Sequence, residues 1–177
     1  LQHTGITDLD FSNHPAIQLV NIQGGEDAVD KMNSLNLQNC ATLENVDIRY
    51  TTIKSLSMKH LPIVRTLMML NNDITTITID DCEEFNDITC DHNVLGTLSL
   101  TNNPQLRAVN CEDNRLQVLI ADNCPVLGQV QVFNNRLMWL DLKDVVKGNV
   151  DESILKLDNQ QPTVQAVKLS PTETGLL

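Results

Sequence analysis

Aromatic residues are scarce in this chain of 177 residues: it has one Trp, one Tyr and three Phe, although apolar residues make up 41% of the sequence. A core with so few rings has to be built from stacked aliphatic side chains. No stretch approaches the roughly 20 consecutive apolar residues that a membrane-spanning helix requires. We therefore expect an aliphatic core and no membrane insertion in this segment.

Basic residues are also few, with 12 Lys and Arg against 23 Asp and Glu, a net charge of −11 and a pI near 4.5. Contact with nucleic acid depends on clustered Lys and Arg that neutralise phosphates, so no nucleic acid partner is expected. The chain begins at Leu1 with neither an initiator Met nor a leader, which favours a processed product whose export signal has been removed.

The chain contains a repeat with a period of 21 residues. With Met32 as offset zero, this position is apolar in every following copy: Ile53, Ile74, Leu95, Leu116 and Leu137. Further apolar rows fall at offsets 3, 5, 11, 14 and 16. Offset 19 is Thr51 in the first copy and then Asn in the next four: Asn72, Asn93, Asn114 and Asn135. A fixed period of this size indicates a solenoid, in which each turn stacks on its neighbour.

Each copy carries two strand signals, about ten residues apart. In the clearest copy, Leu95-x-x-Leu98-x-Leu100, the last three residues alternate as in a strand with one buried face. Twenty-one residues are too few for two strands, two corners and a regular helix. We expect right-handed parallel β coils of about six to seven turns with little helix. The Asn row should lie at a corner, where an inward amide hydrogen-bonds buried backbone groups.

The repeat is irregular at both ends. A first copy is visible from Ile6, but 26 residues separate it from Met32, so five extra residues are expected in a bulge at Gly24–Ala28. The pattern fails after Leu142. We therefore predict a solenoid over residues 1–142 and a C-terminal cap of short strands over residues 143–177, which shields the last turn.

The segment Leu106-x-x-Val109-x-Cys111-x-x-Asn114-x-Leu116 resembles the leucine-rich-repeat motif. The repeat of 21 residues with Cys in the ladder is similar to the short-repeat, internalin-like class of bacterial proteins. This resemblance implies an extracellular or cell-surface protein whose sheet contacts protein or glycan ligands without a cofactor. The binding residues of that family are variable, so the resemblance assigns no role to any residue here.

Alternation along the second strand of each copy predicts which side chains face outward. Met68, Leu70 and Phe133 are apolar at positions where the pattern expects polar residues, which indicates a contact surface. The alternative, scattered surface apolar residues without a role, stays open. The candidate ligand-binding residues are Arg49, Tyr50, Met68, Leu70, Asp91, Glu112 and Phe133. On the other strand row, we expect the cap to cover an apolar cluster: Val118, Ile120, Met138 and Trp139.

The five cysteines fall in two rows of the repeat. Cys40, Cys82 and Cys124 share offset 8, and Cys90 and Cys111 share offset 16 in adjacent copies. The last two come within disulfide range, but stacked side chains that point the same way make the required torsion awkward. We favour buried thiols that act as small apolar residues. The absence of Cys-x-x-Cys argues against a metal site.

No arrangement of His, Cys, Ser or acidic residues at a repeated spacing suggests catalysis. Four acids crowd one corner, where we favour a solvated acidic surface over a weak cation site: Asp80, Asp81, Glu83 and Glu84. The favoured function is a non-enzymatic binding module of a bacterial surface or secreted protein. The alternatives are a structural spacer domain with no ligand of its own and a cytosolic adaptor.

Overall fold

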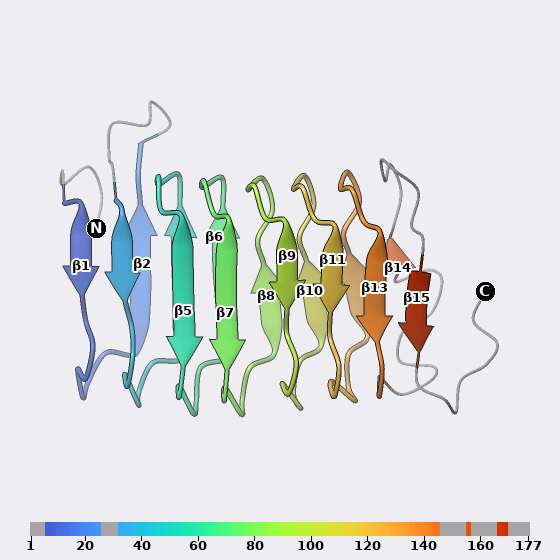
Figure 1. Ribbon diagram of the computed structural model, residues 1–177. Helices are drawn as coiled ribbons and strands as arrows, with labels where there is room; N and C mark the ends of the chain where they lie inside the picture. Colours follow the sequence, from blue (N-terminus) through green and yellow to red (C-terminus); the bar gives the residue numbers. More distant parts are fainter. Residues whose placement is uncertain (1–5, 26–31, 146–154, 157–165, 170–177) are drawn as a thin grey trace.

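The computed structural model of the chain is a parallel β-solenoid in which two sheets run side by side along the whole length (Figure 1). It describes residues 6–25 and 32–145 together with strands at 155–156 and 166–169, and none of these residues is helical. The eight-stranded sheet contains, in spatial order, β1 (Asp8–Asp10), β3 (Ser34–Asn36), β5 (Ser55–Lys59), β7 (Thr76–Asp80), β9 (Thr97–Ser99), β11 (Val118–Ile120), β13 (Trp139–Leu142) and β15 (Ala166–Leu169). The seven-stranded sheet contains β2 (Leu19–Gln23), β4 (Asn45–Arg49), β6 (Thr66–Leu70), β8 (Asp87–Thr89), β10 (Ala108–Asn110), β12 (Gln129–Gln131) and β14 (Leu155–Lys156).

Equivalent residues of neighbouring turns pair in register. Leu98 lies opposite Leu119, and Leu119 lies opposite Leu140, so the ladder steps by 21 residues. The step is the same from β3 to β13, which gives a regular solenoid of about five turns and confirms the predicted repeat ladder. Between β1 and β3 the step is 26, since Leu9 pairs with Leu35. The expected insertion of five residues is therefore confirmed, although most of the predicted bulge lies outside the described residues.

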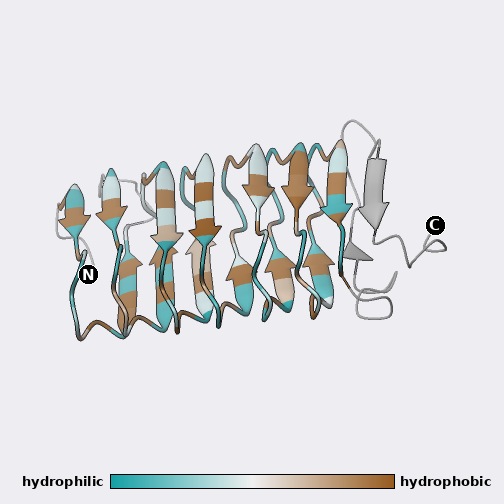
Figure 2. Ribbon diagram, turned by 60° about the horizontal axis from the view of Figure 1, so that its bottom comes forward, coloured by the Kyte–Doolittle hydropathy of each residue, from teal (hydrophilic) through white to brown (hydrophobic). Residues whose placement is uncertain are grey.

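The core is a set of stacked aliphatic columns rather than a single rounded cluster. Apolar and polar positions alternate along the strands, with the apolar side chains directed between the two sheets (Figure 2). Leu98, Leu119 and Leu140 are completely buried, as are their counterparts on the second sheet, Ile88 and Val109. Phe85 is the largest fully buried side chain, so the low aromatic content is matched by an aliphatic interior.

Each turn reverses direction at two corners, and each corner carries one residue in the left-handed conformation. One column of these residues has offset 7 and consists of Asn39, His60, Asp81, Asn102, Asn123 and Asp144. The other has offset 18 and consists of Tyr50, Asn71, His92, Asp113 and Asn134. Asn and Asp adopt positive φ more readily than most other non-glycine residues, which explains their frequency here. The residue after each of them directs its side chain into the core.

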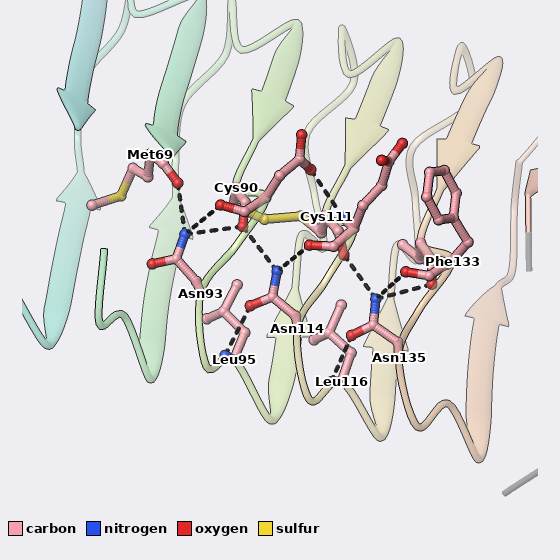
Figure 3. Close-up of a disulfide and its surroundings, with 12 residues drawn as sticks. Met69, Cys90, Asn93, Leu95, Cys111, Asn114, Leu116, Phe133 and Asn135 are labelled. Atoms are coloured by element: carbon pink, nitrogen blue, oxygen red, sulfur yellow. Dashed lines mark hydrogen bonds between the residues drawn. A yellow bond between two sulfur atoms is a disulfide. The ribbon is translucent and has the colours of Figure 1, made fainter. Parts of the chain in front are cut away.

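The inward Asn row closes the second corner, as predicted. The Oδ1 atom of Asn114 accepts a hydrogen bond from the Leu95 N–H at 3.0 Å, and its Nδ2 donates to the carbonyl oxygens of Cys90 and Glu112 at 2.9 Å each (Figure 3). Asn93 and Asn135 make the same contacts one turn earlier and one turn later. One amide thus satisfies backbone groups of two successive turns, which water cannot reach.

Replacing Asn114 with Ala should lower the free energy of unfolding by about 2–4 kcal/mol, because buried backbone donors and acceptors lose their partner. Urea unfolding followed by circular dichroism measures the change. The matched control is Asn110→Ala on the outward face of β10, where the side chain bonds only the Gln129 amide. Equal losses for the two variants would show that the Asn ladder is not a special source of stability.

Candidate functional site

Five of the seven predicted ligand-binding residues form one column along an edge of the seven-stranded sheet. Arg49 and Leu70 end β4 and β6 and pair in register. The other three follow β8, β10 and β12 by two residues each, and every member of the column is half-buried: Arg49, Leu70, Asp91, Glu112 and Phe133. We call this set the edge column. Met68 lies one outward position further into β6, and Tyr50 follows Arg49 at the corner, so the structure brings all seven side chains to one face.

The N-terminal part of this face is held by polar contacts. Asp47 and Arg49 form an ion pair with 2.7 Å between Oδ1 and Nε, and a second bond of 3.0 Å joins Oδ2 and Nη2. These hydrogen bonds to Asp47 raise the pKa of Arg49. The Nη2 atom of Arg49 also lies 3.9 Å from the Sδ atom of Met68. Arg49 is therefore positioned against Met68 before any ligand arrives.

Two carboxylates lie in the middle of the edge column, between Leu70 and Phe133. The Oδ1 atom of Asp91 accepts a hydrogen bond from the backbone N–H of Glu112 at 2.9 Å. Burial raises the pKa of Asp91. Burial also raises the pKa of Glu112, and the negative charges of Asp91 and Asp113 add to that effect. The described residues include no group of three or more His, Cys, Asp or Glu side chains arranged to hold a metal ion.

A disulfide between Cys90 and Cys111 lies directly beneath these carboxylates, with 4.7 Å between the Cα atoms and both side chains fully buried (Figure 3). The preference for two separate thiols at these positions was wrong. In-register pairing of β8 and β10 brings equivalent Cα atoms within the range that a disulfide spans. The sequence signal was the occurrence of Cys at the same offset in adjacent copies, which was noted but given too little weight.

The other three cysteines are buried thiols that act as hydrogen-bond donors. The Sγ–H groups of Cys40, Cys82 and Cys124 donate to carbonyl oxygens of the preceding turn, those of Phe11, Met58 and Leu100. They close the first corner as the Asn row closes the second. Burial raises the pKa of Cys82 and raises the pKa of Cys124 to about 11, so both thiols stay protonated at neutral pH. Their spacing of two turns keeps them from pairing with one another.

Asn103 interrupts this cysteine row. It is fully buried, and its Nδ2 donates to the carbonyl oxygens of Leu100 and Thr101 at 2.8 and 3.3 Å. Its Oδ1 atom has no hydrogen-bond partner. In the same row, the fully buried Leu61 occupies the equivalent place two turns earlier. Asn103 is therefore a position where the local sequence does not satisfy the rule that the rest of the corner follows.

The crowded acidic corner borders an open groove. Asp81 and Glu83 line it together with His60 and Asn102, and its volume is about 690 Å³. His60 Nδ1 lies 3.2 Å from Asp81 Oδ2, and both side chains are about two-thirds exposed, at 65% and 66%. These contacts fit a solvated polar surface along the first corner, and they bring no further acids into the edge column.

The apolar cluster on the opposite sheet lies on the outward side of β11 and β13. Val118, Ile120 and Trp139 are half-buried and Met138 is 37% exposed. Strand β15 continues the sheet beside β13, with Ala166 opposite Trp139. The remaining part of the predicted cap lies outside the described residues, so its covering of this cluster stays a prediction. No helix in the described residues has the length and apolar character needed to cross a bilayer.

The fold and the edge column define the class of protein: a parallel β-solenoid with coils of 21 residues and an outward face of mixed apolar and acidic character. No family model matches the chain, and neither curated proteins nor solved structures show a significant similarity to it. The class therefore rests on the ladder itself, and its closer affiliation is a matter for proposal.

Replacing Asn103 with Leu should raise the free energy of unfolding by about 1 kcal/mol, because the unpaired Oδ1 atom disappears. The carbonyl oxygen of Leu100 keeps the Cys124 thiol as its donor. The reverse change in the same row, Leu61→Asn, should lower the stability by about 2–3 kcal/mol. Chemical unfolding of both variants tests the pair, and a loss of stability in Asn103→Leu would contradict the interpretation.

Replacing Asp91 with Asn should raise the melting temperature at pH 7 by about 1–3 °C. The raised pKa means that ionisation of Asp91 is less favourable in the folded than in the unfolded chain. Its contribution to stability is therefore fully present below the unfolded pKa and is lost as the pH rises through the folded pKa. The Asn amide oxygen still accepts the Glu112 N–H, so the gain should vanish near about pH 3, where the carboxyl is protonated in both states.

The control for this variant is Glu83→Gln, which removes one negative charge at an exposed corner. Thermal unfolding of both variants between pH 3 and 7, followed by circular dichroism, separates the local effect from that of net charge. An equal gain in both variants would refute the role of burial at Asp91.

Proposed function

We propose that this chain is a non-enzymatic binding module of a bacterial surface or secreted protein and that it belongs to the leucine-rich-repeat class. Its closest resemblance within that class is to internalin-like proteins with short repeats, and it has six to seven turns when the irregular end turns are included. It contacts a protein or glycan ligand through the outward face of the seven-stranded sheet. The argument rests on the edge column and on Met68 beside it.

The observation that carries the proposal is the position of Met68, Leu70 and Phe133. The outward positions of β4, β8 and β12 hold polar residues, among them Asp47, Thr89 and Gln131. The three larger apolar side chains therefore interrupt a polar face, and two of them border the carboxylates of the edge column. Partly exposed apolar groups within a polar surround are typical of a contact surface.

The cysteine chemistry supports an extracellular or cell-surface location. Disulfides persist in oxidising compartments, and one joins Cys90 to Cys111. The remaining three thiols are buried and hydrogen-bonded, and the raised pKa of Cys82 and Cys124 keeps those two unreactive. An odd number of cysteines is therefore compatible with oxidising surroundings.

The alternative is a structural spacer of a larger surface protein, with no ligand of its own. Its support is the side-chain ladder along the exposed corners, where Asn39 bonds Asn13, Asn123 bonds Asn102 and Asn134 bonds Asp113. Such ladders stiffen a rod without forming a ligand site. The spacer predicts that the intact module captures nothing.

The test is the triple variant Met68→Ser, Leu70→Ser and Phe133→Ser. Binding is measured on a glycan array and by capture of purified host-surface proteins, and the variant should lose at least about tenfold in affinity because the central apolar anchors are gone. The melting temperature should change little, because all three side chains are already partly exposed.

The matched control places the same changes on the opposite sheet, as Val118→Ser, Ile120→Ser and Met138→Ser. Unchanged capture by the first variant together with loss in the second would assign the ligand to the wrong face. No capture by the unmodified module on either platform would favour the spacer.

A further inference from the structure

The interface between two central turns has the least strand pairing in the regular part of the solenoid. Strands β7 and β9 pair at a single position, Thr78 with Ser99, and β8 pairs with β10 at three. One turn earlier, β5 and β7 pair at five positions. Solenoid stability is a sum over neighbouring turns, so the interface with the shortest ladders is where the rod opens most easily.

The disulfide crosses this same interface. Cys90 follows β8 and Cys111 follows β10, and the bond closes a loop of one complete turn, with a sequence separation of 21. The Nδ2 atoms of Asn93 and Asn114 both donate to the Cys90 carbonyl oxygen, at 3.0 and 2.9 Å. The covalent bond and the amide ladder therefore hold the same corner (Figure 3).

Both sulfur atoms belong to fully buried residues, between Met69 and Val132 in the same inward row. A reductant therefore reaches the bond only when the two turns separate. We propose that the Cys90–Cys111 disulfide is a redox-dependent lock across the interface between the turn of β7 and β8 and the turn of β9 and β10. Oxidised, it joins the two halves of the solenoid into one cooperative unit; reduced, the halves open independently.

The lock forms by thiol–disulfide exchange with a small disulfide such as oxidised glutathione. One cysteine thiolate attacks the reagent and releases one thiol, which leaves a mixed disulfide. The second thiolate then attacks the protein sulfur of that mixed disulfide and releases the second thiol, so two protein thiols and one disulfide become one protein disulfide and two small thiols. This device ties the full stability of the solenoid to oxidising surroundings, and it does not depend on which ligand the module binds.

The test compares hydrogen exchange of the whole chain after refolding with oxidised glutathione and after refolding with a reductant. Opening at the interface should be about 100-fold more frequent in the reduced chain, because a closed loop of about 20 residues restricts the open state. Amides in β9–β12 should therefore exchange about 100-fold faster when the chain is reduced. Thiol titration of the unfolded oxidised chain should find three free thiols.

The redox-blind control is the double variant Cys90→Val and Cys111→Val, in which the new side chains match Val132 in the same row. Its exchange should be the same under both conditions and should resemble that of the reduced chain. Equal exchange of the unmodified chain in the two states would overturn the proposal, and so would five titratable thiols after oxidation. Neither readout involves ligand capture.

Discussion

In-register stacking of residues 21 apart is the constraint on which the rest of the structure depends. Because successive turns have the same length, each strand meets the equivalent strand of the next turn, and apolar side chains form continuous columns. The corners are the difficult places, since the backbone there leaves the ladder while it is still buried. A left-handed residue followed by an inward donor resolves this at both corners.

Two chemically different side chains perform this task. Asn amides close one corner and supply both donors and an acceptor, as Asn72 does for Ile48 and Thr51. Cysteine thiols at the other corner donate to carbonyl oxygens of the preceding turn, as Cys124 does to Leu100. Each coil therefore consists of two similar halves, and the thiol row is a polar ladder as well as part of the apolar core.

The same stacking determines what the surface presents. A side chain at an outward position is repeated by its counterparts one strand spacing away, so chemical character changes along columns and not across loops. The edge column combines Leu70 and Phe133 with two carboxylates of raised pKa, and the disulfide lies below them. The proposed binding face and the proposed lock are thus neighbouring outcomes of one register.

The sequence by itself determined the period, the buried rows, the two strands per coil, the role of the Asn row and the five inserted residues, because all of these are regularities along one dimension of the chain. Only the tertiary structure decided which groups meet across turns: the bond between Cys90 and Cys111, the gathering of Arg49 and Phe133 into one column, and the unpaired oxygen of Asn103. Those outcomes depend on distances of a few ångströms between stacked positions. A repeat pattern names the positions that stack, whereas the register and direction of each side chain are properties of the folded ladder.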